Sequence, residues 1–248
     1  MPGFFYRTKS QLNGAPIIIA CVETKSVANT KTGSMAQIYI LPDVGPGITA
    51  QQAWDDGESY AAVCGDCKHR THNTCYVLRF RGSSSVLAAV YRGKSYKEVS
   101  PDNFALRLGN FDEVRFGADG DPAAIPEEHF QWMTFFANKR TGYTHQWKHA
   151  KFEYLKATVM ASCDTVDEYY QARQAGWRPF RIRTKDEPLL DGEYVCPASA
   201  EAGHRLKCQT CLTCDGADPD RPRAASPAII VHASQKKFGL LRLQLANT

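Results

Sequence analysis

The apolar positions of the first third of the chain fall in short runs that turn-forming residues separate. Pro16–Val22 and Ala36–Leu41 are two such runs, and Asn13-Gly14 and Pro42-Asp43 stand at their ends. Apolar runs of this length, bounded by Gly, Pro, Asn and Asp, are typical of buried strands. The pattern therefore predicts a β-rich part over residues 1–60.

After residue 110 the pattern alternates between strands and helices. The expected strands are Asp112–Phe116, Ala157–Ser162, Trp177–Arg183 and Ala228–Ala233, and the expected helices are Pro126–Asn138, Lys148–Lys156 and Val166–Ala175. An early proline, acidic residues in the first turn and a closing glycine such as Gly176 are the usual signals of helix ends. A strand–helix–strand unit over 157–183 favours parallel strands with a right-handed crossover.

This alternation predicts an α/β fold, with a full or partial parallel α/β barrel as its architecture. We expect one domain over residues 1–248, with a β-rich N-terminal part (1–60) and a βα core (61–190). A Cys-rich metal-binding insertion (191–226) and a final strand with a tail (227–248) complete it. Ligands of such folds bind at the loops that follow the carboxyl ends of the strands.

Composition changes this picture little. The chain has 248 residues, 43% of them hydrophobic and 23% charged, as globular proteins have. Its net charge of +4 permits nucleic acid or a nucleotide as partner without requiring it. The candidates for phosphate contacts are Arg178, Arg181 and Arg183 with Lys185, and the stretch Lys68-His69-Arg70. The longest apolar run, 17–22, is far shorter than the roughly 20 residues that span a membrane, and no secretory signal is visible. We expect a cytoplasmic protein with no membrane partner.

The unusual feature is the cysteine content of nine. In a reducing compartment, clustered cysteines bind metals or act in catalysis more often than they form disulfides. The first group, Cys64, Cys67 and Cys75, combines a CxxC with a third cysteine, and His69 and His72 lie between them. Three thiolates and one histidine would complete a zinc site. Three thiolates with an open position would instead suit an iron–sulfur cluster that presents one iron to a ligand.

A second group lies near the C-terminus and comprises Cys196, Cys208, Cys211 and Cys214. Four thiolates in a polar stretch suit either a zinc ion or a four-iron cluster. A closed four-thiolate site is more often structural than catalytic. The remaining two cysteines, Cys21 and Cys163, are in or beside apolar strands and are expected in the core.

A glycine-rich acidic loop follows the predicted strand 112–116. Glycines allow a ligand to approach the backbone, and carboxylates accept hydrogen bonds from an amine or a ribose, or bind a cation. The loop is a candidate cofactor-binding segment through Gly117, Asp119, Gly120, Asp121 and Pro122.

The stretch GYTHQW at 142–147 combines two aromatic rings with a histidine and a glutamine. His145 is a candidate general acid/base or ligand, and Tyr143 or Trp147 could stack on a base. With Asp119 and Asp121, His145 completes the set of candidate catalytic residues.

Several stretches together resemble a family of uncharacterised phage and prophage Cys-rich proteins. They are KTGSMAQ at 31–37, CGDC…CYV at 64–77, GADGDPAAIP at 117–126, GYTHQW at 142–147, and CPAS…CxxCxxC at 196–214. The resemblance extends from about residue 29 to residue 216. It implies a phage-encoded protein that works in the host cytoplasm.

More broadly, the chain is similar to radical S-adenosylmethionine enzymes. Those enzymes have a partial α/β barrel, three cysteines in a loop after an early strand, and a Gly-rich acidic motif after the next strand. The resemblance implies that Cys64, Cys67 and Cys75 bind a reactive cluster, and that Gly117–Pro122 holds the amino group of the cofactor's methionine. The second cysteine group then resembles an auxiliary cluster. The spacing here is CxxC followed by seven residues and Cys, where the superfamily has CxxxCxxC.

The favoured interpretation is a phage-encoded metal- or iron–sulfur-binding enzyme, similar to radical S-adenosylmethionine enzymes, that acts on nucleic acid, a nucleotide or a small substrate. One alternative is a zinc-stabilised module that binds nucleic acid or a host protein without catalysis. The other is zinc-assisted base exchange or hydrolysis on a nucleotide, with Asp119 or Asp121 as nucleophile or general base.

Overall fold

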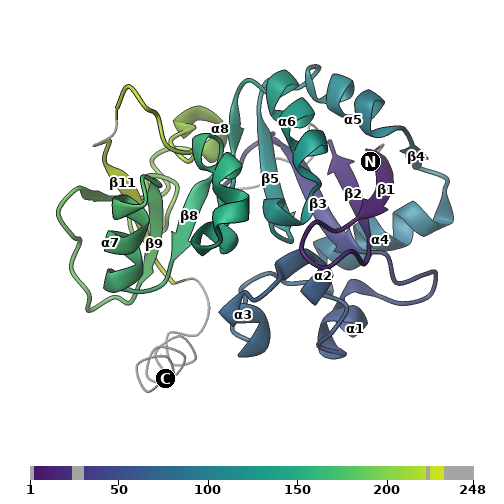
Figure 1. Cartoon of the computed structure of the whole chain (residues 1–248), viewed down its shortest axis with the longest axis horizontal. Coiled ribbons are helices and arrows are strands. Elements are labelled where there is room, and N and C mark those ends of the chain that lie inside the picture. The colour runs from purple at the N-terminus through teal and green to yellow at the C-terminus, as the bar shows by residue number, and fades with distance from the viewer. Residues whose placement is uncertain (1–2, 24–30, 222–223, 232–248) are drawn as a thin grey trace.

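The computed structural model describes residues 3–23, 31–221 and 224–231. They form a mixed α/β fold with two sheets, in which most strand pairs are parallel (Figure 1). The six-stranded sheet has the order β4-β1-β2-β3-β5-β6, and the five-stranded sheet has the order β10-β11-β9-β8-β7.

The first sheet begins as an antiparallel meander of β1 (Gly3–Lys9), β2 (Pro16–Val22) and β3 (Ala36–Pro42). Residues 17–21 of β2 are fully buried, because β2 is a central strand covered on both faces. β4 (Tyr96–Glu98) pairs parallel with β1, and β5 (Val114–Asp119) pairs parallel with β3. β6 (Arg140–Thr141) follows β5 at the edge.

All pairs of the second sheet are parallel. Its strands are β7 (Tyr143–Thr144), β8 (Met160–Cys163), β9 (Pro179–Arg183), β10 (Glu193–Val195) and β11 (Ser226–Ile230). Only Gly142 separates β6 from β7, so the chain passes directly from one sheet to the other. A Cβ atom at Gly142 would lie 2.6 Å from the Val159 side chain, which explains the glycine at this junction.

Short helices connect the strands. They are α1 (Ala50–Asp55), α2 (Ala61–Cys64), α3 (Lys68–Thr71), α4 (Gly82–Arg92), α5 (Pro101–Leu108), α6 (Glu127–Phe136), α7 (Val166–Gln174) and α8 (Cys208–Cys211). Three 3₁₀ segments are η1 (Pro122–Ala124), η2 (Gln146–Lys148) and η3 (Ala150–Ala157). Figure 1 shows α1, α2 and α3 together at one end of the first sheet, and α7 beside the strands of the second.

The predicted strand–helix–strand unit over 157–183 is confirmed as β8, α7 and β9, and the predicted strands 16–22 and 36–41 are confirmed as β2 and β3. The predicted short helix at Lys148–Lys156 is confirmed as helical structure of the 3₁₀ type, because this stretch contains the end of η2 and most of η3. The predicted strand Ala228–Ala233 corresponds to β11, and residues 232–233 lie outside the described residues. The prediction of a mixed α/β fold is confirmed.

Three arginines that were candidates for phosphate contacts are used inside the protein. Arg181 is fully buried and donates to both carboxylate oxygens of Glu193, at 2.8 and 2.7 Å. Arg183 pairs with Glu201, and Arg178 with Asp215. Their side chains therefore hold the second sheet and its loops together. Among the described residues, no helix combines the length and the apolar character that crossing a bilayer requires.

Trp147 joins the aromatic motif to the second sheet, because its buried indole Nε1 donates to the Ser162 carbonyl in β8 at 2.9 Å. Trp147→Phe leaves that carbonyl without its donor, and we expect the free energy of unfolding to fall by about 1–2 kcal/mol. Urea unfolding measures the loss. Trp132→Phe is the matched control, since Trp132 is 48% exposed on α6. An equal loss in both variants would contradict the assignment.

Candidate functional site

One cavity of about 140 Å³ brings together the first cysteine group, the acidic loop and the histidine of the aromatic motif. Cys64, Cys67 and Cys75 line it from the segment between β3 and α4. Residues at the end of β5 and just after it line the cavity beside them, and His145 follows β7. β3 pairs parallel with β5, β5 with β6, and β7 with β8, so the cavity lies at the carboxyl side of parallel strands, where ligands of α/β folds bind.

The three thiols of the first group come from a tight local structure. Cys64 ends α2, Gly65 adopts a positive φ of 56°, and the amide of Cys67 donates to the Cys64 carbonyl at 3.1 Å. Burial raises the pKa of each thiol, most strongly that of Cys64. The thiols are therefore neutral as they stand, and a metal would bind by displacing their protons.

Arg79 lies directly behind the first cysteine group. It is 3% exposed, and its Nη2 donates to Cys75 Sγ at 3.3 Å and to Asp119 Oδ1 at 3.2 Å. The guanidinium also lies over the rings of Trp54 and Tyr60, 3.5 and 4.7 Å from their centroids. Burial alone would lower the pKa of Arg79, but Asp119 offsets this, so the pKa is raised and the group carries a fixed positive charge.

Both carboxylates of the acidic loop are already hydrogen-bonded within the protein. Asp119 accepts from the Tyr60 hydroxyl at 2.8 Å as well as from Arg79 and the amide of Gly120. Asp121 accepts from the amides of Ala123 at 3.0 Å and His145 at 2.7 Å. The loop therefore offers a ligand mainly its backbone, whereas its carboxylates fix the surrounding segments.

Gly120 allows the acidic loop to lie against β3. Its φ is +81°, and a Cβ atom there would be 2.3 Å from the Ile40 carbonyl oxygen. We expect Gly120→Ala to destabilise the protein by about 2–3 kcal/mol, because strain at positive φ adds to the clash with the backbone. The control is Gly57→Ala, with φ +78° and open space around the position, which isolates the cost of φ alone. Equal losses in thermal unfolding would contradict this close approach.

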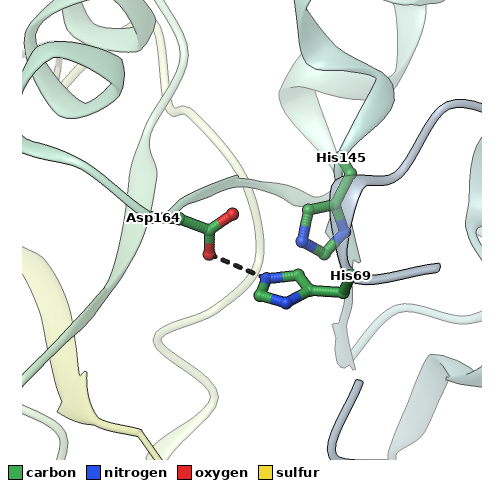
Figure 2. Close-up of side chains that lie close together, drawn as sticks. All are labelled: His69, His145 and Asp164. Atoms are coloured by element: carbon green, nitrogen blue, oxygen red, sulfur yellow. Dashed lines mark hydrogen bonds and ion pairs between the residues drawn. The ribbon is translucent and has the colours of Figure 1, made fainter. Parts of the chain in front are cut away.

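His69, His145 and Asp164 meet at the edge of the cavity (Figure 2). His69 bonds Thr74 Oγ1 through Nδ1 at 2.8 Å and Asp164 Oδ1 through Nε2 at 3.0 Å. The two imidazole rings are 5.4 Å apart, edge to face. Burial alone would raise the pKa of Asp164, but its neighbours His69, His145 and Lys68 outweigh this and hold the pKa well below its usual range.

The second cysteine group lies between the two sheets and connects several segments. The amide of Cys196 donates to the Ala228 carbonyl, and that of Cys208 to the Lys31 carbonyl, both at 2.9 Å. Cys196, Cys208 and Cys214 pack in one apolar cluster with Met160, and burial raises the pKa of Cys214 to about 12. Only Cys208 of this group also lines the cavity. The backbone of this group therefore links segments that are far apart in the sequence.

The spacing between candidate ligand atoms distinguishes the possible metal sites in the described part of the chain. All nine cysteines lie in the described part of the chain and are free thiols. The one set of three or more candidate ligand atoms within 4.8 Å of one another among these residues is that of His69, His145 and Asp164, and it contains no sulfur. Zinc with bonds of about 2.3 Å needs its sulfurs about 4 Å apart, whereas a four-iron cluster binds each thiolate at a separate iron and spaces the thiolates more widely.

The structure thus brings together Cys64, Cys67, Cys75, Asp119, Asp121 and His145, with Gly117 and Gly120 also lining the cavity. Pro122 begins η1 and is buried. Of the two aromatic residues expected to stack on a base, Tyr143 packs on Phe180 at 4.7 Å and lines the cavity with it, whereas Trp147 is buried.

Sequence reasoning missed Arg79, Tyr60 and the role of Asp164. Asp164 does not cap α7, because the Thr165 side chain accepts from the amide of Glu168 there. Asp164 turns instead toward His69. A carboxylate directly after an apolar strand was the signal that could have found it.

A scan of protein-family models and searches of curated proteins and of solved structures gave no match to this chain.

Proposed function

We propose that this protein is an enzyme that holds an iron–sulfur cluster on Cys64, Cys67 and Cys75 and acts on a small substrate in the adjoining cavity. The observation that carries the proposal is the convergence of three buried thiols, the acidic loop and His145 on one cavity at the carboxyl side of parallel strands. A structural metal site would need the thiols but not the cavity.

The charges around the cavity support an iron–sulfur cluster that is bound by thiolates. Three thiolates bring negative charge into a buried place, and Arg79 offsets part of it through its hydrogen bond to Cys75. Lys31 and Arg115 line the same cavity. Basic groups near thiolates favour their ionised form. An iron–sulfur cluster with one open iron supplies single-electron chemistry to a ligand bound beside it.

S-adenosylmethionine is the co-substrate that we propose, and a partial barrel is the architecture that the two joined sheets would form. The support is the position of the acidic loop, which forms the end of β5 and the turn after it, beside the cysteine segment that follows β3. Within that loop, Gly117 and Gly120 line the cavity, and the hydrogen bonds of Asp119 and Asp121 keep the loop in place. The acid–base role of His145 stays a prediction.

The substrate that fits best is a small molecule or nucleotide rather than a nucleic-acid strand. Arg178, Arg181 and Arg183 are engaged in ion pairs, and Trp147 is buried. Base exchange with Asp119 or Asp121 as nucleophile has less support, because both carboxylates already accept several hydrogen bonds. For the second cysteine group we propose a closed structural cluster, because its sulfurs do not lie as close together as zinc requires.

The test is reductive cleavage of S-adenosylmethionine by protein that has been reconstituted anaerobically with iron and sulfide and then reduced with dithionite. We expect 5′-deoxyadenosine and methionine as products. Cys64→Ser and Cys67→Ser should form neither, and Cys21→Ala, in the core of β2, should retain the activity. A reconstituted cluster that leaves S-adenosylmethionine intact would contradict the co-substrate, and failure to form a cluster would contradict the whole proposal.

A further inference from the structure

We propose that His69, His145 and Asp164 form a second metal site, which binds one divalent first-row transition ion through two imidazole nitrogens and one carboxylate. Their candidate ligand atoms all lie within 4.8 Å of one another (Figure 2). This inference does not depend on the iron–sulfur proposal, because none of its ligands is a cysteine.

The first observation is the state of His145. Its Nε2 is buried and has no hydrogen-bond partner among the described residues. The residue itself is fixed, since its backbone amide donates to Asp121 Oδ2 at 2.7 Å. A buried ring nitrogen without a partner lowers the stability of the folded protein unless a ligand binds to it. A metal ion is such a ligand for a neutral imidazole.

The second observation is that the hydrogen bonds of His69 can accommodate an ion. With Nε2 facing Asp164 and Nδ1 facing the Thr74 hydroxyl, the ring has a partner on each side. In the tautomer that carries its proton on Nδ1, His69 donates a hydrogen bond to the Thr74 hydroxyl, and the lone pair of Nε2 can bind the metal. Thr74 would then orient the ligand from behind, as second-shell partners of metal-bound histidines do.

The third observation is the balance of charges. Lys68 Nζ lies 3.2 Å from Asp164 Oδ2 and 2.7 Å from Glu168, and Lys148 lies 2.7 Å from Glu168. The two lysines are thus matched by two carboxylates, and Asp164 Oδ1 is the oxygen that faces His69. Two neutral imidazole nitrogens and the carboxylate of Asp164, which also faces Lys68, suit an ion that prefers imidazole ligands. Calcium and magnesium require more oxygens.

The proposed site also has access for a ligand. His145 lines the thiol cavity and also a second, polar cavity of about 490 Å³, to which Ser162 and Glu168 contribute. Two histidines and one carboxylate leave coordination positions open for water or a substrate atom. The ion would stand between the two cavities.

Cobalt(II) is the probe that tests this site, because its absorption distinguishes thiolate ligands from nitrogen and oxygen ligands. The full chain, stripped with a chelator and kept anaerobic, is titrated with Co²⁺. We expect one class of sites with d–d bands and no thiolate charge-transfer band. His145→Gln should weaken this class at least about tenfold, and Thr74→Val should weaken it less. The control is His149→Gln, an exposed histidine four residues away.

The outcomes separate this site from the thiolate site. The proposal is supported if His145→Gln loses the class of cobalt sites without thiolate ligands and His149→Gln binds cobalt as the wild type does. Equal cobalt binding by wild type and His145→Gln would overturn it, as would the absence of any thiolate-free class in wild type. Circular dichroism of each variant shows that it is folded. The presence or absence of thiolate bands bears only on the cysteine groups.

Discussion

Cys64→Ser should deprive the protein of its reactive cluster. Cys64 is 9% exposed, ends α2 and faces the cavity beside Cys67 and Cys75. A serine hydroxyl is a poor ligand for iron, and with two thiolates left we expect the affinity for the cluster to fall by more than about tenfold. Iron and acid-labile sulfide in anaerobically reconstituted protein measure this loss, together with the visible absorption.

The matched control is Cys21→Ala, because Cys21 is fully buried in β2 and does not line the cavity. It should keep the iron and sulfide of the wild type, with a loss of stability of about 1 kcal/mol. If Cys64→Ser kept a full complement of iron and sulfide, the first cysteine group would not be the cluster site.

Arg79→Met should be among the most destabilising substitutions in the described part of the chain. The side chains of Arg79 and Asp119 are 3% and 1% exposed, so the substitution leaves a buried carboxylate without its counter-charge. We expect the free energy of unfolding to fall by about 3–5 kcal/mol. The cavity should also lose its cation beside Cys75. Urea unfolding measures the first effect, and the iron content after reconstitution measures the second.

Two further variants isolate the cause. Arg81→Met changes an exposed arginine two residues away and should cost less than about 0.5 kcal/mol. The double variant Arg79→Met/Asp119→Leu removes both charges and should recover part of the stability that Arg79→Met loses. If the double variant lost the sum of the two single losses, the ion pair would contribute nothing as a pair.

The sequence predicted the fold best where periodicity was strong. β2 and β3 are continuous apolar runs with turn residues at their ends, and α7 has a threonine cap and a closing glycine. The helices between β3 and β5 were not predicted. α2 and α3 have four residues each, and α4 begins with Gly82 and three serines, which are weak helix formers. Tertiary packing decides these elements.

The site was predictable to the extent that its residues are close in sequence. Spacing pointed to both cysteine groups, the acidic loop and His145, and the structure brings the first group, that loop and His145 to one cavity. Arg79 carried no local signal, since its partner Asp119 lies 40 residues further on. The contact between His69 and Asp164 spans 95 residues, so only the three-dimensional fold reveals it.

The metal content of the unmodified protein tests the central claim most directly. The chain is purified without oxygen, and its iron, acid-labile sulfide and zinc are measured along with its absorption spectrum. We predict a brown protein whose iron and sulfide are present in equal amounts and fall by the content of one cluster in Cys64→Ser. A colourless protein that contains zinc alone, and takes up no iron or sulfide on anaerobic reconstitution, would contradict the account.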